Sequence, residues 1–300
     1  MTPTTQTYYD RFSATYEDHR HHGYHRMIDE LELELIRRYG AGRDVFEAGC
    51  GTGLLLKEAA AVARSAVGLD LSRGMLGQAR DRGLKVVQGS ITHVPLPSAS
   101  FDLAYSMKVL AHIPPIENAL VELARLIRPG GHLLLEFYNP WSLRYLAKRW
   151  GGPARIADET TDHDVFTRYD TLERARSYLP EGLKFVGVRG VRVVTPTSKL
   201  WGLPGLGSVF ERVEHAICDL PGLRRLGGFM IVIAQKTYPM AQLRGDILLV
   251  DDERSVREFL AIYLKRAGHQ VETVASMAEA REAIARHEFD VLITDLRMPD

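Results

Sequence analysis

The stretch Val45-Phe-Glu-Ala-Gly-Cys-Gly-Thr-Gly53 decides the fold, because three glycines join an apolar run directly to a helical segment. Residues 44–48 predict a short buried strand, and the Ala/Leu-rich residues 54–64 predict a helix. A turn without side chains lets a ligand approach the backbone closely at the N-terminal end of the helix. The stretch therefore predicts a strand–turn–helix unit that opens onto a ligand site.

The sequence around this turn alternates between strand and helix patterns with short links. Further strands are expected at 65–71, 85–88, 101–106 and 132–137, and helices at 27–39, 74–82 and 116–127. Such alternation is typical of a parallel sheet with helices on both faces. The strand-like runs 183–194 and 229–235 enclose a helix at 208–217 but no regular βα unit, so we expect them to form an antiparallel hairpin that closes the sheet. The predicted fold class is α/β, with a Rossmann-like, seven-stranded domain.

A second βα rhythm begins at Asp246. Strands are predicted at 247–250, 270–274 and 291–294, and helices at 255–267 and 277–287. From Asp246 to Asp300 there are 12 acidic and 7 basic residues, whereas the remaining chain has 26 acidic and 31 basic residues. This change in charge indicates a domain boundary, and we predict domains at 1–240 and 246–300.

The composition narrows the class of protein. Hydrophobic residues make up 45% and charged residues 25% of the chain, as in soluble globular proteins. The formal net charge is zero, and no strongly basic face of a nucleic-acid-binding protein is evident. Two distant cysteines indicate neither a disulfide framework nor a zinc site. We find no signal peptide and no apolar run long enough to span a membrane, so we expect a cytoplasmic protein.

An acid at the end of the second predicted strand suggests a nucleoside ligand. Asp70 closes Val67-Gly-Leu-Asp70, where a carboxylate can accept both hydroxyls of a ribose. A dinucleotide site requires G-x-G-x-x-G, but Leu54 occupies the third glycine position here. Glu47 also precedes the turn, and a carboxylate there would favour an ammonium or sulfonium over a pyrophosphate. A nicotinamide-dependent oxidoreductase is therefore the weaker alternative.

Residues 45–140 resemble the class I S-adenosylmethionine (SAM)-dependent methyltransferases, especially the branch of the ubiquinone and menaquinone biosynthesis enzymes. The resemblance is carried, in order along the chain, by Val45–Gly53, Gly68–Ser72, Gly89–Ile91, Pro95–Pro97, Phe101-Asp102 and Arg128–Gly131 followed by Leu133–Phe137. It implies transfer of a methyl group from SAM to a small-molecule acceptor, which we expect to be aromatic or apolar. The N-terminal Tyr8-Tyr9-Asp-Arg-Phe12 and Tyr16 resemble the lid of this family.

The resemblance also implies roles for single residues. Gly49 and Gly51 would line the methionine part of SAM, Glu47 would face its ammonium, and Asp70 would hold the ribose. Leu71 and Met75 would pack on the adenine, with Ser90 and Ile91 along its edge; the family usually has Asp where Ser90 stands. The full predicted SAM-binding set is Tyr16, Glu47, Gly49, Cys50, Gly51, Gly53, Asp70, Leu71, Met75, Ser90 and Ile91.

His112 follows the fourth predicted strand and is the candidate catalytic base, although a histidine that only shapes the pocket is the competing interpretation. Tyr105 and Lys108 do not have the spacing of a short-chain dehydrogenase. The histidines His19, His21, His22 and His25 lack a completing acid or cysteine, which argues against a metal site. Aromatic residues of the cap form either an acceptor pocket or ordinary packing; they are Trp141, Tyr145, Trp150 and Trp201.

Residues 246–300 resemble the first part of a response-regulator receiver domain, a flavodoxin-like βαβαβ segment. The resemblance implies that Asp252 and Asp295 bind Mg²⁺ with the help of the Arg297 carbonyl, that Asp295 accepts a phosphoryl group, and that a histidine kinase is the partner of a complete receiver. The family's later strands, Ser/Thr and Lys do not follow Asp300, so we expect a fragment without stable phosphorylation. A two-component signalling protein, in which the receiver governs the N-terminal domain, is the alternative function.

Overall fold

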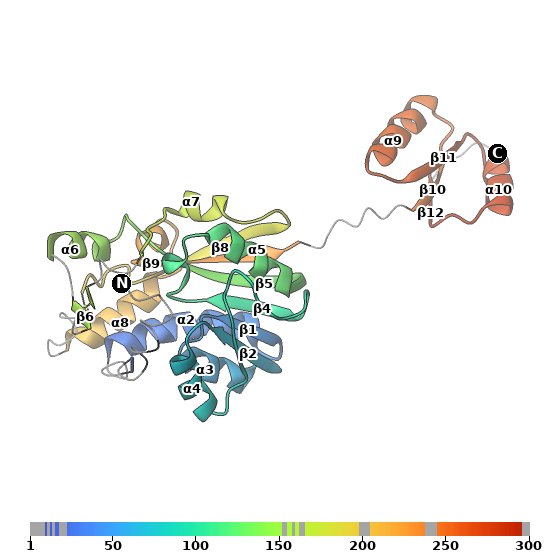
Figure 1. Ribbon diagram of the computed structural model, residues 1–300. Helices are drawn as coiled ribbons and strands as arrows, with labels where there is room; N and C mark the ends of the chain where they lie inside the picture. Colours follow the sequence, from blue (N-terminus) through green and yellow to red (C-terminus); the bar gives the residue numbers. More distant parts are fainter. Residues whose placement is uncertain are drawn as a thin grey trace. The chain divides into compact units, whose positions relative to one another are not determined.

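The computed structural model describes residues 10, 13, 16–17, 23–151, 155–157, 160–161, 166–197, 205–237 and 245–295. The chain forms two compact units, Met1–Thr237 and Tyr238–Asp300, and each is described by itself (Figure 1).

The first unit is built on a seven-stranded sheet with the strand order β3-β2-β1-β4-β5-β9-β8. Six strands run in the same direction, and β9 runs antiparallel to both of its neighbours, β5 and β8. This confirms the predicted parallel sheet and its antiparallel closure. The strands are β1 (Asp44–Ala48), β2 (Ser65–Asp70), β3 (Val86–Gln88), β4 (Phe101–Ser106), β5 (Ile127–Tyr138), β8 (Leu183–Val191) and β9 (Phe229–Lys236).

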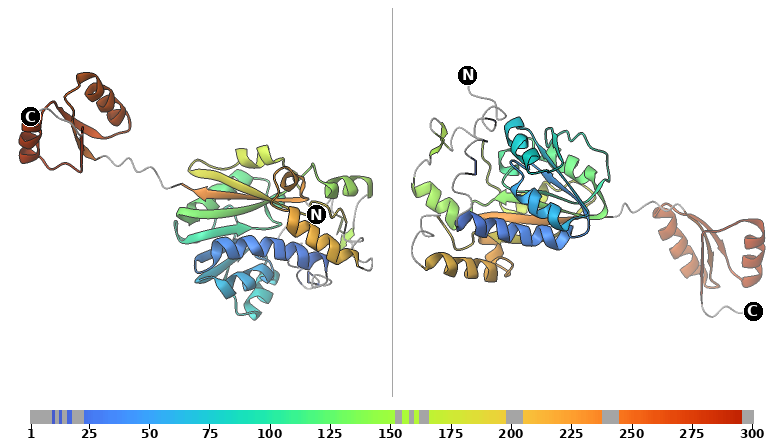
Figure 2. Two further views of the ribbon diagram at one scale, coloured as in Figure 1. Left: turned by 180° about the vertical axis from the view of Figure 1, so that it is seen from behind. Right: turned by 90° about the horizontal axis from the view of Figure 1, so that it is seen from below.

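Helices cover both faces of this sheet, with α2 and α3 on one face and α5 and α7 on the other (Figures 1 and 2). The buried residues of α5, Ala119, Leu120, Leu123 and Ala124, follow the helical spacing of the sequence. The helices are α2 (Tyr24–Gly40), α3 (Leu54–Val62), α4 (Arg73–Asp81), α5 (Ile116–Leu126), α6 (Leu143–Gly151), α7 (Leu172–Ser177) and α8 (Leu206–Ile217). Short elements are η2 (Leu110–His112), η4 (Leu223–Leu226), β6 (Arg155–Ala157) and β7 (Thr160–Thr161).

The Arg-Pro-Gly-Gly segment after α5 differs from its expected form. The predicted helix 116–127 and strand 132–137 leave Arg128–Gly131 as a link between them, but β5 already begins at Ile127, which pairs with Phe101. The register of the β4–β5 pair then shifts, and Gly130 adopts a φ of 82°. A Cβ on Gly131 would come within 2.6 Å of the Asp102 carbonyl oxygen, so the close approach of the two strands requires glycine here.

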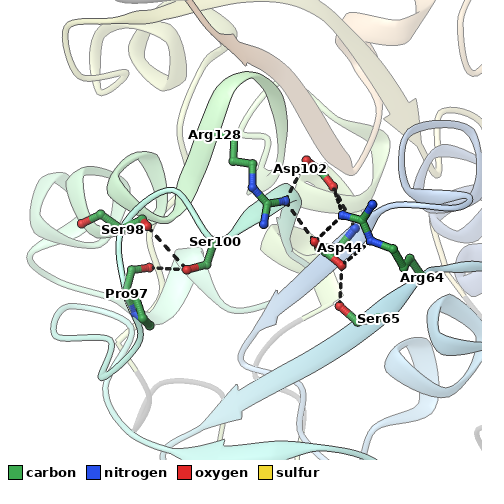
Figure 3. A network of polar contacts seen from close by, with 8 residues as sticks. All are labelled: Asp44, Arg64, Ser65, Pro97, Ser98, Ser100, Asp102 and Arg128. Atoms are coloured by element: carbon green, nitrogen blue, oxygen red, sulfur yellow. Dashed lines mark hydrogen bonds and ion pairs between the residues drawn. The ribbon is translucent and has the colours of Figure 1, made fainter.

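At the amino ends of the parallel strands, charged side chains form a paired network (Figure 3). Arg128 Nη1 donates to Asp44 at 3.0 Å and to Asp102 at 2.9 Å, and Arg64 donates to both acids. The Ser65 hydroxyl donates to Asp44 at 2.7 Å. Hydrogen bonds from Arg64 and Ser65 hold the pKa of Asp44 well below its usual range. At Asp102 burial raises the pKa, but the hydrogen bonds from the Asp44 N–H and from Arg128 outweigh burial, and the pKa of Asp102 is lowered.

The second unit contains a three-stranded parallel sheet with the order β11-β10-β12. Its elements are β10 (Asp246–Val250), α9 (Arg254–Arg266), β11 (Gln270–Val274), α10 (Met277–Arg286) and β12 (Val291–Thr294). Leu248 and Val250 pack against Val274, Ala280 and Ala283 in its small core. In neither unit do the described residues include a helix with the length and apolar character to cross a bilayer.

Candidate functional site

An open cleft with about 820 Å³ of empty space lies at the carboxyl ends of β1, β2 and β4. Ligands of open α/β sheets bind at this edge, outside the carboxyl ends of the strands. Nine residues predicted from the sequence line the cleft: Tyr16, Gly49, Gly51, Asp70, Leu71, Met75, Ser90, Ile91 and His112. The cleft walls thus come from segments that lie far apart in the chain.

The glycine turn after β1 brings bare backbone to the cleft. Gly49 has a φ of 79° and Gly51 a φ of 54°, both in the left-handed region that favours glycine. A Cβ on Gly49 would lie 2.4 Å from a Val109 methyl group, whereas a Cβ on Gly51 would meet nothing within 4 Å. Gly51 therefore leaves open space at the cleft, and Gly49 lets the loop after β4 pack against the turn.

Asp70 lies at the end of β2 with its carboxylate fixed by two backbone groups. One oxygen accepts from the Gly51 N–H at 2.8 Å, and the other accepts from the Ser72 N–H at 2.9 Å. Burial raises the pKa of Asp70 and outweighs these hydrogen bonds, which lower it. Each oxygen keeps a second acceptor position, so the carboxylate is oriented to receive hydroxyl donors from the cleft.

Glu47 lies behind the turn rather than in the cleft wall, buried to 3% exposure. Its Oε2 accepts a hydrogen bond from the Tyr105 hydroxyl at 3.0 Å. Burial raises the pKa of Glu47 well above its usual range, and the charges of Glu32 and Asp70 add to this effect. An incoming cation would lower that pKa, so the region behind the turn favours positive charge.

Lys108 is a cleft residue that the sequence did not identify as a binding residue. It follows β4 with a φ of 61°, and its Nζ lies 3.0 Å from Asp29 Oδ1 and 2.7 Å from Glu32 Oε1. Its backbone N–H donates to the fully buried Glu136 at 3.2 Å. Burial raises the pKa of Glu136 well above its usual range, and Glu32 adds to the effect. A non-glycine residue with positive φ at a cleft carries backbone strain that no sequence pattern reveals.

Apolar side chains form part of the cleft walls. Met75 is 2% exposed and Ile91 6% exposed, whereas Leu71 is 40% exposed at the mouth. The Ser90 hydroxyl is engaged with Thr92, at 2.8 Å from its hydroxyl and 3.2 Å from its backbone N–H. The sequence analysis also missed other lining residues next to the strand ends, namely Leu69, Gly89, Met107, Val109 and Ile113. Met107, Val109 and Ile113 follow β4, and that position is their only sequence signal.

His112 ends the short η2 helix at the cleft. Its Nδ1 lies 2.9 Å from the Phe166 carbonyl oxygen, so this nitrogen carries the proton and Nε2 is the acceptor. Burial lowers the pKa of His112; the Phe166 carbonyl opposes this, and the charges of Arg144 and Lys148 lower the pKa further. The imidazole is therefore neutral near pH 7 and able to accept a proton.

Besides Glu47, two further predicted binding residues lie outside the cleft lining. The Cys50 thiol is buried under the turn, where a Cβ on Gly68 would come within 2.7 Å of its sulfur. Gly53 is the N-cap of α3, and a Cβ there would lie 2.4 Å from Leu84. Both residues support the turn from below.

Part of the predicted lid is described. Tyr16 lines the cleft, and the Asp10 carboxylate accepts from the Gly74 N–H at 3.0 Å and from the Ser72 hydroxyl. Trp141 is 72% exposed, and the Tyr145 ring packs against Tyr169 at a centroid distance of 4.8 Å. The other predicted lid and cap residues lie outside the described residues; they are Tyr8, Tyr9, Arg11, Phe12, His19, His21, His22, Trp201 and the side chain of Trp150.

In the second unit the acids follow neighbouring strands. Val250 pairs with Thr294, so Asp251 and Asp295 both lie at the carboxyl edge of this sheet. Asp251 is 9% exposed and accepts from the Glu253 N–H at 2.8 Å, whereas Asp252 and Asp295 are exposed. Within the described part of the chain, no three acidic, His or Cys side chains converge as metal ligands.

The fold and the cleft define a class of protein: a Rossmann-like α/β protein with an open cleft at the carboxyl edge of its sheet, where ligands of such sheets bind. Comparison with known proteins is more specific. Residues 46–135 match the family model of the methyltransferase domain, and residues 247–300 match that of the response regulator receiver domain.

Relatives agree with the first match. The ubiquinone biosynthesis O-methyltransferase of Methylococcus capsulatus is 30% identical over 177 residues, which cover 55% of this chain and 73% of the relative. The malonyl-[acyl-carrier protein] O-methyltransferase of Serratia marcescens is 36% identical over 111 residues, which cover 36% of this chain and 44% of that relative. The chain thus spans less than half the length of the Serratia enzyme.

A solved SAM-dependent methyltransferase from Thermotoga maritima has the same fold, with a TM-score of 0.57 and 21% identity, over 76% of this chain and 98% of that one. The chain belongs to the class I SAM-dependent methyltransferases, and its C-terminal segment has the sequence of a response regulator receiver domain.

Proposed function

We propose that the first unit transfers a methyl group from SAM to an oxygen atom of a small-molecule acceptor. The observation that carries the proposal is the Asp70 carboxylate, held by the Gly51 and Ser72 N–H groups beside the glycine turn of an apolar cleft. Both relatives named above are O-methyltransferases, which supports an oxygen acceptor.

The residues of the cleft fit the parts of SAM. Asp70 would accept the two ribose hydroxyls, and the open space at Gly51 would admit the methionine part. Leu71, Met75, Ile91 and Ser90 would enclose the adenine, and Tyr16 would cover it. Glu47 would balance the positive charge from behind the turn. SAM supplies a methyl group already activated on a sulfonium, so the protein's main task is to align the acceptor and exclude water.

His112 is the proposed base of the reaction. Its Nε2 would accept the proton of an acceptor hydroxyl as the oxygen forms its bond to the methyl carbon. The hydrogen bond from Nδ1–H to the Phe166 carbonyl fixes this tautomer, and the lowered pKa keeps the ring neutral near pH 7. The imidazolium would then return its proton to solvent.

Transfer of a labelled methyl group from SAM to a panel of phenols, hydroxy acids and acyl thioesters with a free carboxyl group tests the proposal. We expect one acceptor class to be labelled, and His112→Gln to lower kcat by about 100-fold or more, the usual contribution of a base. The loss should diminish at high pH, where the acceptor ionises unaided. Failure of the wild-type chain to bind S-adenosylhomocysteine would refute the proposal.

The receiver segment supports a smaller set of proposals. We retain the domain limits 1–240 and 246–300, with Asp295 as the phospho-acceptor, Mg²⁺ at Asp252 and Asp295, and a histidine kinase as partner. Their support is the match to the receiver family. Labelling with acetyl phosphate and Mg²⁺, with Asp295→Asn as control, tests them. Control of the methyltransferase by this segment is the less favoured alternative.

A further inference from the structure

Beside the cleft, two arginines and several aromatic rings form a cluster that methyl transfer itself does not require. The Arg144 Cζ atom lies 4.7 Å from the ring centroid of Tyr138 and 4.7 Å from that of Phe229. Arg192 lies over the same Phe229 ring at 5.7 Å and over Tyr24 at 4.9 Å. Phe229 is therefore in contact with two guanidinium groups.

The backbone holds the two arginines together. A Cβ on Gly228 would lie 3.0 Å from the Arg144 Cβ and 3.3 Å from the Arg192 Cβ, so both side chains pack over this glycine. Arg192 has a φ of 62°, a conformation that a non-glycine residue adopts at an energetic cost. It donates to the carbonyls of Thr195 at 3.3 Å and Pro196 at 2.9 Å, which orient its guanidinium.

Positive charge is in excess here. Among the described residues Arg144 makes no ion pair, and its buried Nη1 has no hydrogen-bond partner. The nearby buried carboxylate, Glu214, is already engaged by the N–H groups of Val193 at 2.8 Å and Val194 at 3.0 Å and by the Thr195 hydroxyl. Burial and, to a smaller extent, the charge of Arg144 lower the pKa of Arg192 to about 10, so the guanidinium is still charged at neutral pH. A buried donor without a partner is costly and points to a missing acceptor.

The cluster lies next to the proposed site of methyl transfer. Tyr138 ends β5 at the carboxyl edge of the sheet, and its ring packs edge-on against His112 at a centroid distance of 5.7 Å. The charge of Arg144 also reaches His112 and lowers the pKa of its imidazole. One aromatic ring thus separates the guanidinium from the candidate base.

We propose that the methyl acceptor carries an oxyanion, and that Arg144, supported by Arg192, binds this group while the reacting oxygen lies at His112. This inference rests on the proposed function and names the substrate class of the same site. Guanidinium groups pair with carboxylates and phosphates through two parallel N–H donors, which fixes orientation as well as affinity. Stacking on Tyr138 and Phe229 holds the guanidinium plane in place for this purpose.

Matched pairs of small probes test the proposal with S-adenosylhomocysteine present at saturation. The pairs are 4-hydroxybenzoate with 4-hydroxybenzamide, octanoate with octanamide, and phenyl phosphate with phenol, each titrated by calorimetry. In at least one pair we expect the anion to bind 10-fold or more tightly than its neutral partner. The carboxylate and phosphate arms then distinguish the two oxyanions.

Variants test whether the preference for the anionic probe depends on the arginine cluster. Arg144→Met keeps an apolar stem over the rings and should abolish the preference, whereas Arg144→Lys should keep part of it. Arg149→Met removes an exposed charge from the same helix and should change nothing. Equal binding of anions and neutral partners, or a preference that survives in Arg144→Met, would overturn the proposal.

The cofactor titration separates the two levels of inference. If wild type and Arg144→Met bind S-adenosylhomocysteine alike while no probe pair is distinguished, the oxyanion proposal fails and the methyltransferase proposal stands. If wild type does not bind S-adenosylhomocysteine, the proposed function itself fails. Should Arg144→Met not fold, the Arg144→Lys variant and the probe pairs on wild type still decide the question.

Discussion

The acidic side chains at the two edges of the seven-stranded sheet have opposite environments and opposite pKa shifts. At the amino edge Asp44 and Asp102 are paired with Arg64 and Arg128, and their pKa values are lowered. At the carboxyl edge Asp70 lines the open cleft and Glu47 is buried behind it, and the pKa values of both acids are raised. Paired charge stabilises the fold, whereas buried acids beside open space are prepared for a cationic ligand at some cost in stability. The amino edge of the sheet therefore contributes mainly to stability, and the carboxyl edge contributes mainly to ligand binding.

The largest expected effect is the loss of binding in Asp70→Ala. Removing an acceptor of two hydroxyl donors should weaken S-adenosylhomocysteine about 100-fold or more, or about 2.7 kcal/mol. Titration calorimetry measures this loss. Asp102→Ala at the opposite edge is the matched control and should bind as wild type does. If both variants lost the same affinity for S-adenosylhomocysteine, ligand binding would not depend on the carboxyl edge alone.

A pair of glycine variants sharpens the comparison. Gly42 and Gly49 both have positive φ, at 70° and 79°, but only at Gly49 would a Cβ meet a neighbour, the Val109 methyl at 2.4 Å. Gly42→Ala should cost only the backbone strain, about 1 kcal/mol, and leave ligand binding intact. Gly49→Ala should cost more and also weaken S-adenosylhomocysteine, because Val109 must move in the cleft wall. Urea unfolding with calorimetry checks both; a Gly49→Ala variant with unchanged binding would contradict us.

Asp44→Ala should remove the hydrogen bonds and ion pairs at the amino edge of the sheet and leave ligand binding in the cleft unchanged. Asp44 accepts from two arginines and a serine, but its partners are partly exposed, so we expect a loss of about 1–2 kcal/mol in the free energy of unfolding. The three tryptophans, at 141, 150 and 201, all lie in the first unit, so their fluorescence follows its unfolding in urea. A variant as stable as wild type would mean that the network contributes nothing.

The stability of the amino edge should also depend on pH with a definite sign. Because the pKa of Asp44 is lower in the folded protein, its contribution is fully present above the unfolded value near 3.8 and is lost as the pH falls through the folded value. The difference in unfolding free energy between wild type and Asp44→Asn should therefore shrink as the pH falls below about 4. A difference that stays constant down to acid pH would exclude this linkage.

The smallest expected effect is a release of protons at the carboxyl edge. Burial raises the pKa of Glu47 well above its usual range in the free protein, and the ammonium of S-adenosylhomocysteine should lower that pKa. Binding near pH 7 should thus release a fraction of a proton, seen as a dependence of the binding heat on buffer ionisation enthalpy. Glu47→Gln should lose this dependence; proton uptake in wild type would contradict the prediction.

Much of the molecule could be predicted from local pattern. The parallel sheet, its antiparallel closure and the second βαβαβ unit all follow from the spacing of apolar residues and from glycine turns, and the structure confirms them. Gly49, Gly51 and Asp70 could be placed at one crevice, because strand ends of a parallel sheet meet at the same edge. The position of β9 between β5 and β8 had no such local signal.

The sequence by itself determined the fold class and the family, because periodicity and the glycine turn are properties of neighbouring residues. Only the tertiary structure decided which side chains face the cleft. It turned Cys50 beneath the turn, gave Lys108 its positive φ, and gathered Arg144 and Arg192 from distant segments over Phe229. Such contacts depend on how elements pack across the sheet, and the free energy of packing is shared among residues that no local pattern connects.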